Sequence, residues 1–519
     1  MATVVRKCVL SDTRFFCRRR LSIVSGVTLT FARIMATDPN KFQAIISHCK
    51  EYGFIFPSSE IYDGLAAVYD YGQWGSELKK NIKDVWWKSM TQMQENIVGI
   101  DAAIFMHPTT WKASGHVDNF SDPMIDNRDS NKRYRVDHLL EAKADELEKE
   151  GHPDQAELLL QQMEAMLAAS DYDAIKKLIE NNKIVCSVSG TSNWTEVRQF
   201  NLMFSTQIGS VSEEASEIYL RPETAQGIFV NFLNVQKSGR MKIPFGIAQI
   251  GKAFRNEIVA RQFIFRMREF EQMEMQFFIR PGTQREWYEY WKAERLKWHL
   301  SLGIPETQYR FHDHAKLAHY ADAACDIEYN FPIGFKEVEG IHSRTDFDLR
   351  NHQEYSKKKI QYFDNDVDEN GKPYGNYIPY VVETSIGVDR SVMMVLSEAY
   401  EEQDLSTSEK KDSRVVLKLP PKLAPVKVAI LPLVKKDGLP EIARSIMNDC
   451  KSQFRCFYEE KDTIGKRYRR MDAIGTPLCV TVDHQTKEDN TVTIRYRDNM
   501  QQERIPIGKL KDLVLREML

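Results

Sequence analysis

The chain lacks any long hydrophobic run and has few cysteines. No uncharged apolar stretch approaches the roughly 20 residues that a helix needs to cross a bilayer, so no membrane-spanning helix is expected. The eight cysteines are scattered, with no C-x-x-C pair and no histidine at zinc-finger spacing. A reducing compartment and no structural zinc are therefore expected.

Composition and charge indicate a soluble globular protein. Hydrophobic residues make up 42% and charged residues 28% of the 519 residues, and this length predicts two or three domains. The net charge is −3, but residues 426–519 contain eighteen Lys or Arg against fourteen Asp or Glu. A mildly basic C-terminal region suits a polyanionic partner, although a solvated mixed-charge surface explains the count equally well.

Residues 1–35 differ from the rest of the chain. They contain seven Lys or Arg against one acidic residue, with several serines, which is similar to the composition of a transit peptide. Met35 stands directly before residues 36–40, where a helix is expected to begin, so a mis-assigned upstream start codon explains the segment equally well. Either as a leader or as a mis-assigned start, residues 1–35 are expected to lie outside the fold.

Residues 36–402 are expected to form one large domain. Leucines and methionines at helical spacing predict a helical hairpin inserted at about 138–183. Segments 243–251 and 273–279 have the pattern of strands with a loop between them, which predicts an antiparallel pair. A short strand that begins at residue 381 is expected to run into a helix that ends near residue 400.

A second domain is expected at residues 426–519. A polar, proline-containing segment at 403–425 is expected to link it to the first domain. Its length of about 95 residues and its alternating pattern are typical of an α/β unit. Strands are expected at 426–434, 454–458, 477–482 and 491–496, and a closing helix at 509–518.

The stretch around Arg255 and Glu257 is the most informative about function. In a strand, residues two apart point to the same face, so a guanidinium and a carboxylate would lie side by side. A surface salt bridge explains this spacing equally simply. Three more arginines follow within eleven residues: Arg261, Arg266 and Arg268. With the ring of Phe270, which can stack on a base, these cations predict a triphosphate clamp without a glycine-rich loop.

Several motifs then make a family resemblance specific. Phe-Arg-x-Glu at 254–257 and Arg-x-x-x-Phe at 266–270 resemble motif 2 of the class II aminoacyl-tRNA synthetases, and Gly-Val-Asp-Arg at 387–390 resembles their motif 3. Arg-Pro-Glu-Thr-Ala-Gln at 221–226 narrows the resemblance to the homodimeric glycyl-tRNA synthetases. Further runs carry it along nearly all of residues 38–519: 69–72, 78–81, 115–116, 119–120, 122–124 and 341–349.

The resemblance implies an α+β fold, with a class II antiparallel-sheet catalytic domain at 36–402 and a C-terminal anticodon-binding α/β domain. It implies ATP-dependent activation of glycine and transfer of glycine to tRNA(Gly), with Mg²⁺ as cofactor. A cytoplasmic homodimer is implied, with residues 70–87 at the interface. Targeting to an organelle by residues 1–35 stays open.

The resemblance also implies roles in ATP binding. Arg255 is expected at the α-phosphate, Arg266 at the γ-phosphate and Glu257 at the adenine, which Phe270 and Arg390 would cover on its two faces. The residues expected to be catalytic are Arg255, Arg390 and Glu337. The full set of expected ATP-binding residues is Arg255, Asn256, Glu257, Phe265, Arg266, Met267, Arg268, Glu269, Phe270, Glu337, Val338, Gly387, Val388, Asp389 and Arg390.

Glu337 matches the position that holds Mg²⁺ and ATP in the family. A plain carboxylate on a strand face is the alternative. Attack of a carboxylate on the α-phosphorus builds negative charge on oxygen, which arginines and Mg²⁺ stabilise. No general base is expected, because the carboxylate of the amino acid is already the nucleophile.

Glycine has no side chain to recognise, so acidic groups are expected to bind its ammonium. Glu223, Glu383 and Ser385 match the glycine-site positions of the family, and exclusion of larger amino acids would be steric, with no editing domain. The full set of expected glycine-binding residues is Arg135, Glu223, Phe270, Glu271, Gln272, Met273, Glu274, Glu383, Thr384, Ser385, Ile386 and Gly387.

Basic residues interleaved with tyrosines at 466–470 and 495–497 suit the phosphates and unstacked bases of an anticodon loop. A solvated helix face explains them equally well. Two alternative functions also stay open. One is a synthetase for proline, threonine, serine or histidine, which would lack the run at 221–226. The other is a non-catalytic relative, the accessory subunit of mitochondrial DNA polymerase, which should have lost the nucleotide clamp.

Overall fold

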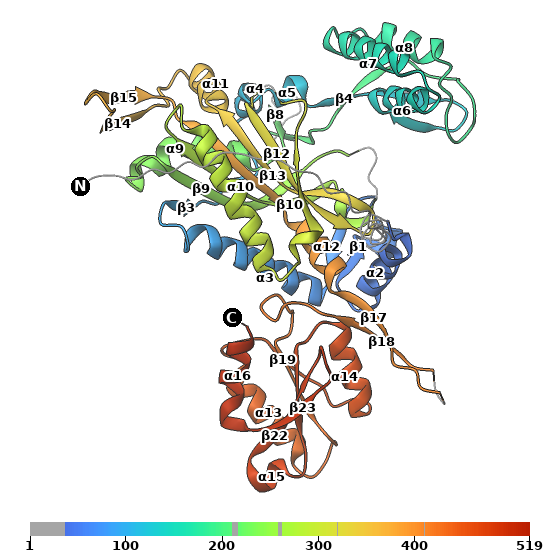
Figure 1. Cartoon of the computed structure of the whole chain (residues 1–519), viewed down its shortest axis with the longest axis vertical. Helices are drawn as coiled ribbons and strands as arrows, with labels where there is room; N and C mark the ends of the chain where they lie inside the picture. Colours follow the sequence, from blue (N-terminus) through green and yellow to red (C-terminus); the bar gives the residue numbers. More distant parts are fainter. Residues whose placement is uncertain (1–36, 210–215, 258–261, 319, 409–410, 519) are drawn as a thin grey trace, which may run out of the picture.

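The computed structural model describes residues 37–518 except 210–215, 258–261, 319 and 409–410. The predicted leader and Arg261 lie outside the described residues. Figure 1 shows a body built on a large sheet, a small unit with α6, α7 and α8 at its upper right, and a C-terminal domain below. Within the described part of the chain, no helix is both long and apolar enough to cross a membrane.

The body contains a seven-stranded sheet in the order β11-β12-β13-β16-β10-β9-β3. All neighbouring strands are antiparallel except β3 and β9, which are parallel. The predicted antiparallel pair is confirmed as β9 and β10. The strands are β3 (Ile97–Gly99), β9 (Phe245–Phe254), β10 (Glu269–Ile279), β11 (Tyr309–Asp313), β12 (Ala323–Phe331), β13 (Gly334–Thr345) and β16 (Tyr380–Gly387).

Strand β10 shows how the two faces of the sheet differ. Met273, Met275 and Phe277 belong to the main hydrophobic core, which includes side chains of α3 (Gln73–Thr91), α10 (Gln284–Ser301) and α12 (Val388–Ala399). Because side chains alternate along a strand, Gln272, Glu274 and Gln276 point to the opposite face. Trp298 on α10, expected in the core, is 6% exposed.

The polar face is covered at one end by α9 (Ala225–Ser238) and α11 (Phe347–Ser356), which pack together. The first described helix, α2 (Pro39–Glu51), begins after Asp38, whose carboxylate accepts a hydrogen bond from Lys41 N at 2.9 Å. The remaining elements of the body are β1 (Ile55–Pro57), η1 (Glu60–Tyr62), β2 (Tyr69–Tyr71), α4 (Pro108–Ala113), α5 (His116–Asn119), β7 (Ser205–Ile208), β8 (Ser216–Tyr219), η2 (Phe263–Phe265), η3 (Glu306–Gln308), β14 (Tyr362–Val367) and β15 (Pro373–Tyr377).

The inserted unit contains one more helix than the expected hairpin. Its helices are α6 (Val136–Lys149), α7 (Pro153–Ala168) and α8 (Tyr172–Asn181), and a small sheet of β4 (Ser121–Asn127), β5 (Lys132–Arg135) and β6 (Arg198–Asn201) joins them to the body. A separate helix, α8, begins after α7, and the Asp171 carboxylate caps its N-terminus by accepting a hydrogen bond from Ala174 N at 3.0 Å.

The segment expected to be a linker contains ordered structure. Strand β17 (Tyr400–Asp404) pairs with β18 (Ser413–Leu417) in a hairpin. Leu419, Leu423 and Ala424 that follow are fully buried. The two domains are therefore joined by packed apolar side chains, which the charge and proline content of 403–425 did not indicate.

The C-terminal domain has a five-stranded mixed sheet in the order β20-β19-β21-β22-β23. The expected strands are present, and β23, a fifth strand after β22, was not expected. The elements are β19 (Val428–Pro432), α13 (Leu439–Cys450), β20 (Cys456–Tyr458), α14 (Ile464–Ala473), β21 (Leu478–Val482), α15 (Thr486–Asp489), β22 (Thr491–Tyr496), β23 (Gln502–Pro506), η4 (Ile507–Lys509) and α16 (Leu510–Glu517).

Candidate active site

A pocket opens on the polar face of the sheet where β10, β16 and the chain after β9 meet. Ten of the residues expected to bind ATP line it, together with several expected at the glycine site. The lining residues are Arg255, Glu257, Ile264, Phe265, Arg266, Met267, Phe270, Glu271, Gln272, Glu337, Ser385, Gly387, Asp389 and Arg390.

Arg255 and Glu257 reach this pocket by a turn, which corrects the expectation that both lie in a strand. Strand β9 ends at Phe254, although Arg255 N still donates to Arg268 O at 2.9 Å, and Asn256 N donates to Leu202 O at 2.8 Å. Glu257 N then donates to Arg255 O at 2.7 Å. The alternation of a strand therefore does not explain why the two side chains share one pocket.

The Arg255 guanidinium is held on two sides. Its Nε donates to Pro222 O at 3.0 Å, and the guanidinium carbon lies 5.3 Å from the centroid of the Phe270 ring. This contact ties the run at 221–226 to the pocket. Phe270, which we expected to stack on the adenine, thus also lies against the Arg255 guanidinium.

Arg390 and Glu337 also line the pocket and pair with each other. Arg390 Nη1 lies 2.9 Å from Glu337 Oε2, and its guanidinium covers the Phe265 ring at 4.5 Å. The positive charge of Arg390 is the largest influence on Glu337 and lowers its pKa. Arg266 lies farther from its acid, with Nη1 3.8 Å from Glu257 Oε2. Each of these two arginines therefore faces a carboxylate within the pocket.

A cluster of three carboxylates lies beside this pocket: Glu274 and Glu383 are buried, and Glu223 is partly buried, with a side chain 17% exposed. Gln276 Nε2 bridges two of them, donating to Glu274 Oε1 at 2.7 Å and to Glu383 Oε2 at 2.6 Å. Arg344 Nη1 donates to Glu383 Oε2 at 2.8 Å. Glu223 accepts from Gln226 at 3.0 Å. We call Glu223, Glu274 and Glu383 the carboxylate cluster.

The three carboxyl groups differ in acidity. Burial raises the pKa of Glu223 and Glu383, but His116, at 3.4 Å from Glu223, and Arg344 and His342 beside Glu383 lower both pKa values below the ordinary range. The pKa of Glu274 is raised well above its usual value, because burial and the neighbouring Glu383 and Glu223 disfavour its charge. Glu223 and Glu383 therefore favour the anionic form, and Glu274 favours the protonated form more than an ordinary glutamate does.

Asp389, expected at the ATP site, is engaged by α3 and its neighbour β2. Tyr71 Oη donates to its Oδ1 at 2.5 Å and Lys79 Nζ at 2.6 Å, while its Oδ2 accepts from Glu271 N at 2.8 Å. Glu271 also pairs with Lys83, whose Nζ lies 2.8 Å from Oε1. The side chains of Asp389 and Glu271, which line the pocket, are thus bound to lysines of α3.

Arg135, expected at the glycine site, lies in the inserted unit. Its Nη2 is 2.5 Å from Asp137 Oδ2 and its Nη1 is 3.3 Å from Asp122 Oδ1. These contacts orient it within that unit, and no contact described in the structure joins it to the carboxylate cluster.

Other expected residues offer little side chain to a ligand. The side chains of Met273, Ile386, Val338 and Val388 belong to the hydrophobic core, and Thr384 is 1% exposed on the same side of β16 as Ile386. Glu269 pairs with Lys252 at 2.6 Å, and Arg268 Nε donates to Glu257 O at 3.2 Å. These residues, and Asn256, can contribute backbone groups to a ligand or hold the residues that line the pocket in position.

Four residues that contact the carboxylate cluster had no expected role: Thr224, Gln276, His342 and Arg344. The Thr224 hydroxyl donates to Glu274, and Arg344 also binds Asp348 at 2.9 and 3.1 Å. Because side chains two apart on a strand share a face, the expected roles of Gln272 and Glu274 could have indicated that Gln276 lies at the same site. Arg344 and His342 lie in the run at 341–349, which contributed to the family resemblance but was given no expected role.

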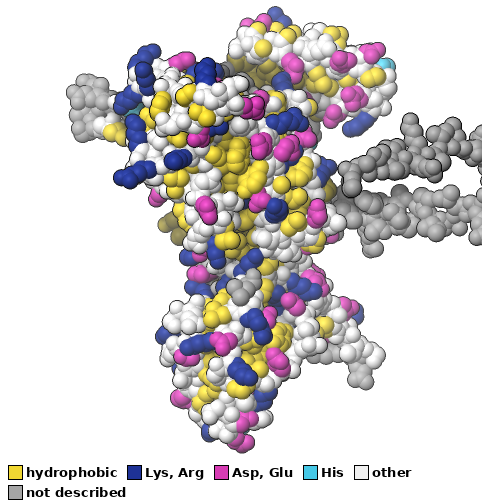
Figure 2. Space-filling view, turned by 60° about the vertical axis from the view of Figure 1, so that its left-hand side comes forward, with side chains coloured by type: hydrophobic (Ala, Val, Ile, Leu, Met, Phe, Trp, Pro, Cys, Tyr) yellow, Lys and Arg dark blue, Asp and Glu magenta, His cyan; other side chains and the backbone are white. Residues whose placement is uncertain are grey.

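The arginines expected to contact tRNA are largely engaged within the C-terminal domain. Arg467 Nη1 donates to Pro432 O at 2.7 Å, Arg495 binds Asp472 at 2.8 and 2.9 Å, and Arg497 Nη1 donates to Gly475 O at 2.8 Å. All three are buried. Figure 2 shows Lys and Arg intermingled with Asp and Glu on the visible face of this domain. Internal support is therefore the better explanation of these three residues.

The structure combines a mostly antiparallel sheet, a pocket lined by the arginines of motif 2, and a strand that runs into a helix at motif 3. These features define a class II aminoacyl-tRNA synthetase. A family described as "Anticodon binding domain" matches residues 427–517, and one described as "Glycyl-tRNA synthetase insertion domain 1" matches 122–157 and 150–202. The second match extends on both sides of the helical segment expected at 138–183.

Curated relatives identify the family. The chain is 52% identical over 477 residues to a glycine–tRNA ligase of Chlorobaculum tepidum, covering 92% of this chain and 99% of the relative. It is 50% identical over 471 residues to that of Treponema denticola, covering 90% and 95%. The chain belongs to the glycine–tRNA ligase family. This confirms the predicted family and fold class and disfavours both alternative functions.

Proposed function

We propose that the chain activates glycine with ATP, releasing pyrophosphate, and then transfers glycine from glycyl-adenylate to the 3′ end of tRNA(Gly). The observation that carries this proposal is the position of the carboxylate cluster directly beside the arginine-lined pocket. Gln272 links them: it lines the pocket, its Oε1 accepts from Thr224 N at 3.2 Å, and its Nε2 donates to Ser385 at 3.3 Å.

The pocket suits a nucleoside triphosphate. Arg255, Arg266 and Arg390 supply three cations, and the carboxylates near Arg266 and Arg390 keep them in place until phosphate oxygens replace those contacts. Negative charge that develops on the α-phosphate during attack by the glycine carboxylate is stabilised by fixed guanidinium groups in a partly enclosed site. Arg255 is oriented by Pro222 O and by the Phe270 ring.

Glu337 fits a Mg²⁺ ion. Its pKa is lowered, so its carboxylate is ionised, and its side chain is 46% exposed in the pocket wall. Mg²⁺ prefers carboxylate and phosphate oxygens and, when bound, supplies charge neutralisation at the phosphates. Glu337 would hold it together with those phosphates, while Arg390 turns from Glu337 to the nucleotide.

The carboxylate cluster suits the ammonium group of glycine. Glu223 and Glu383 are the anionic members, and Ser385 lies on the same face of β16 as Glu383. The raised pKa of Glu274 favours its neutral form, which limits the negative charge that the cluster holds without a ligand. Walls this closely packed leave no space for a β-carbon, which excludes larger amino acids sterically.

We also propose a homodimer that works in the cytoplasm, with residues 70–87 at the interface. Directly before this segment, Ile61, Tyr62 and Leu65 expose 86%, 79% and 58% of their surface. Light scattering after gel filtration tests it: Ile61→Glu is expected to give monomers, whereas Leu515→Glu on α16 leaves dimers. An active monomeric wild-type protein would contradict the dimer.

Charging assays test the proposed function. The protein should attach radiolabelled glycine to a transcript of tRNA(Gly) in an ATP-dependent reaction, and not to a tRNA with another anticodon and acceptor stem. Equal charging of both tRNAs, or none of either, would contradict it.

A further inference from the structure

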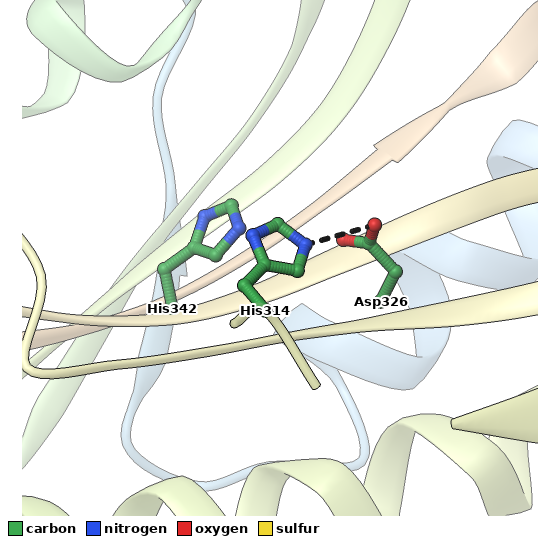
Figure 3. Close-up of side chains that lie close together, drawn as sticks. All are labelled: His314, Asp326 and His342. Carbon is green, nitrogen blue, oxygen red and sulfur yellow. Dashed lines mark ion pairs between the residues drawn. The ribbon is translucent and has the colours of Figure 1, made fainter. Parts of the chain in front are cut away.

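Three side chains of the types that can bind a metal ion converge on the sheet beside the carboxylate cluster. His314 follows β11, Asp326 lies on β12 and His342 on β13, and Figure 3 shows the three side chains next to one another. One ligand atom from each lies within 4.8 Å of the other two. Their side chains are 31%, 14% and 18% exposed, so the group is sheltered but reachable from solvent.

The sheet register brings these residues together. Asp326 pairs with Gly340 across β12 and β13, and His342 stands two residues farther along the same face. A Cβ atom at Gly340 would lie 3.0 Å from His342 Cε1, 3.2 Å from its Nε2 and 3.7 Å from Asp326 Oδ1. The missing side chain of Gly340 therefore makes the space in which the imidazole approaches the carboxylate.

The hydrogen bonding of His342 is that of a metal ligand. Its Nδ1 lies 2.7 Å from Glu383 Oε1. A carboxylate that accepts from one ring nitrogen fixes the tautomer and leaves the other nitrogen as the donor atom for a metal. The Nε2 atom is the one that faces Gly340 and Asp326. Glu383 is thus the outer partner that metal-bound histidines usually have.

An ion pair alone explains part of this arrangement. His314 Nε2 lies 2.9 Å from Asp326 Oδ2, a good distance for a salt bridge. It does not explain why His342, with its ring centroid 5.9 Å from that of His314, presents its second nitrogen to the same place. Tetrahedral Zn²⁺ with bonds of about 2.0–2.2 Å holds its ligand atoms about 3.3 Å apart, so small side-chain rotations complete the site.

We propose that His314, Asp326 and His342 bind one divalent transition-metal ion, with Zn²⁺ as the probe and water completing its coordination. Two imidazoles and one carboxylate favour Zn²⁺ over Mg²⁺ or Ca²⁺, which prefer oxygen ligands. The sequence predicted no zinc because its ligands are 12 and 16 residues apart and lack any short-spaced motif. The sheet alone brings them together.

The site has a consequence for the proposed glycine site, and this part rests on the proposed function. A metal on Nε2 fixes the His342 ring and with it the Glu383 carboxylate, which also binds Arg344 and Gln276. Removal of the metal is therefore expected to raise the KM for glycine several-fold and to leave the KM for ATP unchanged. An unchanged glycine KM would overturn this coupling.

Zinc binding by the full chain tests the site directly. Chelator-treated protein is titrated with Zn²⁺ against a competing indicator, for wild type, His314→Ala and His312→Ala. His312 is the matched control, because it lies two residues away, is 60% exposed and contacts Glu328 at 3.3 Å. Wild type and His312→Ala should each bind one Zn²⁺, and His314→Ala should bind at least about 100-fold more weakly.

X-ray absorption at the zinc edge identifies the ligands. We expect nitrogen and oxygen neighbours at about 2.0–2.1 Å and no sulfur at about 2.3 Å. A sulfur shell, equal affinity in His314→Ala, or no zinc bound by the wild type would each overturn the site. These results do not depend on activity, so a protein that binds zinc but fails to charge tRNA would contradict the proposed function alone.

Discussion

Arg344 Nη1 donates to Glu383 Oε2 at 2.8 Å, deep inside the face of the sheet that carries the active site. The same guanidinium binds both oxygens of Asp348 at 2.9 and 3.1 Å and is 5% exposed as a residue. One buried cation thus compensates two carboxylates, one from the strand that carries the proposed glycine site and one from α11. The order of the carboxylate cluster depends on this contact.

Arg344→Ala should therefore destabilise the protein strongly. It leaves Glu383 and Asp348 buried without their cation, a change that typically costs about 3–5 kcal/mol. Denaturant unfolding measures it. Arg350→Ala is the matched control, since Arg350 pairs with Asp346 at 3.1 Å with a 48% exposed side chain, and such pairs contribute about 0.3–0.5 kcal/mol. Equal losses in both variants would contradict the role of Arg344.

Arg255→Ala should strongly slow activation of glycine without unfolding the chain. Loss of one fixed donor to developing negative charge typically lowers kcat about 10²–10³-fold. Pyrophosphate exchange measures the rate, and circular dichroism checks the fold. Lys252→Ala, which removes an exposed cation of β9 paired with Glu269, should leave exchange near the wild-type rate. Normal exchange by Arg255→Ala would refute its phosphate role.

Glu274→Gln should change how stability depends on pH. Because the folded state raises the pKa of Glu274, its contribution to stability is complete below the unfolded pKa and is lost as the pH rises toward the folded pKa. The amide resembles the protonated acid, so the variant should lose less stability than wild type from mildly acidic to mildly alkaline buffer. Thermal unfolding across this range measures the difference. Glu269→Gln, 40% exposed on the same strand, should follow wild type; if Glu274→Gln does too, Glu274 is not the protonated member.

Gly251→Ala should destabilise the run at 221–226. A Cβ there would lie 2.1 Å from Arg221 Nη2, and Arg221 is fixed by bonds to Lys252 O at 2.6 Å and Ala102 O at 2.7 Å. Such overpacking costs about 1–3 kcal/mol. Gly465→Ala on α14 has open space around its Cβ position and should be neutral or slightly stabilising. A stable Gly251→Ala protein would show that Arg221 can move.

Local patterns predicted the parts of the fold that depend on neighbouring residues. The β9–β10 pair follows from two strands with a loop between them, and the strand-to-helix change at Gly387 follows from residues that are adjacent in sequence. Strand β23 was not expected, because its five residues, Gln502–Pro506, carry little apolar pattern.

The carboxylate cluster shows what local patterns cannot predict. Arg344 and Glu383 are 39 residues apart and meet only through the pairing of β13 and β16. The same limit applies to Arg467 and Arg495, which a basic run suggested for tRNA and which the fold uses internally. The role of a charged side chain depends on which group it pairs with, and pairs between distant residues are not visible in the sequence.

The most direct test of the proposed activation of glycine is amino-acid-dependent exchange of pyrophosphate into ATP, measured with each of the twenty amino acids. We expect glycine to drive exchange far better than the other nineteen, because a carboxylate cluster with closely packed walls accepts an ammonium group but no side chain. Faster exchange with any other amino acid, or none with glycine, would contradict it.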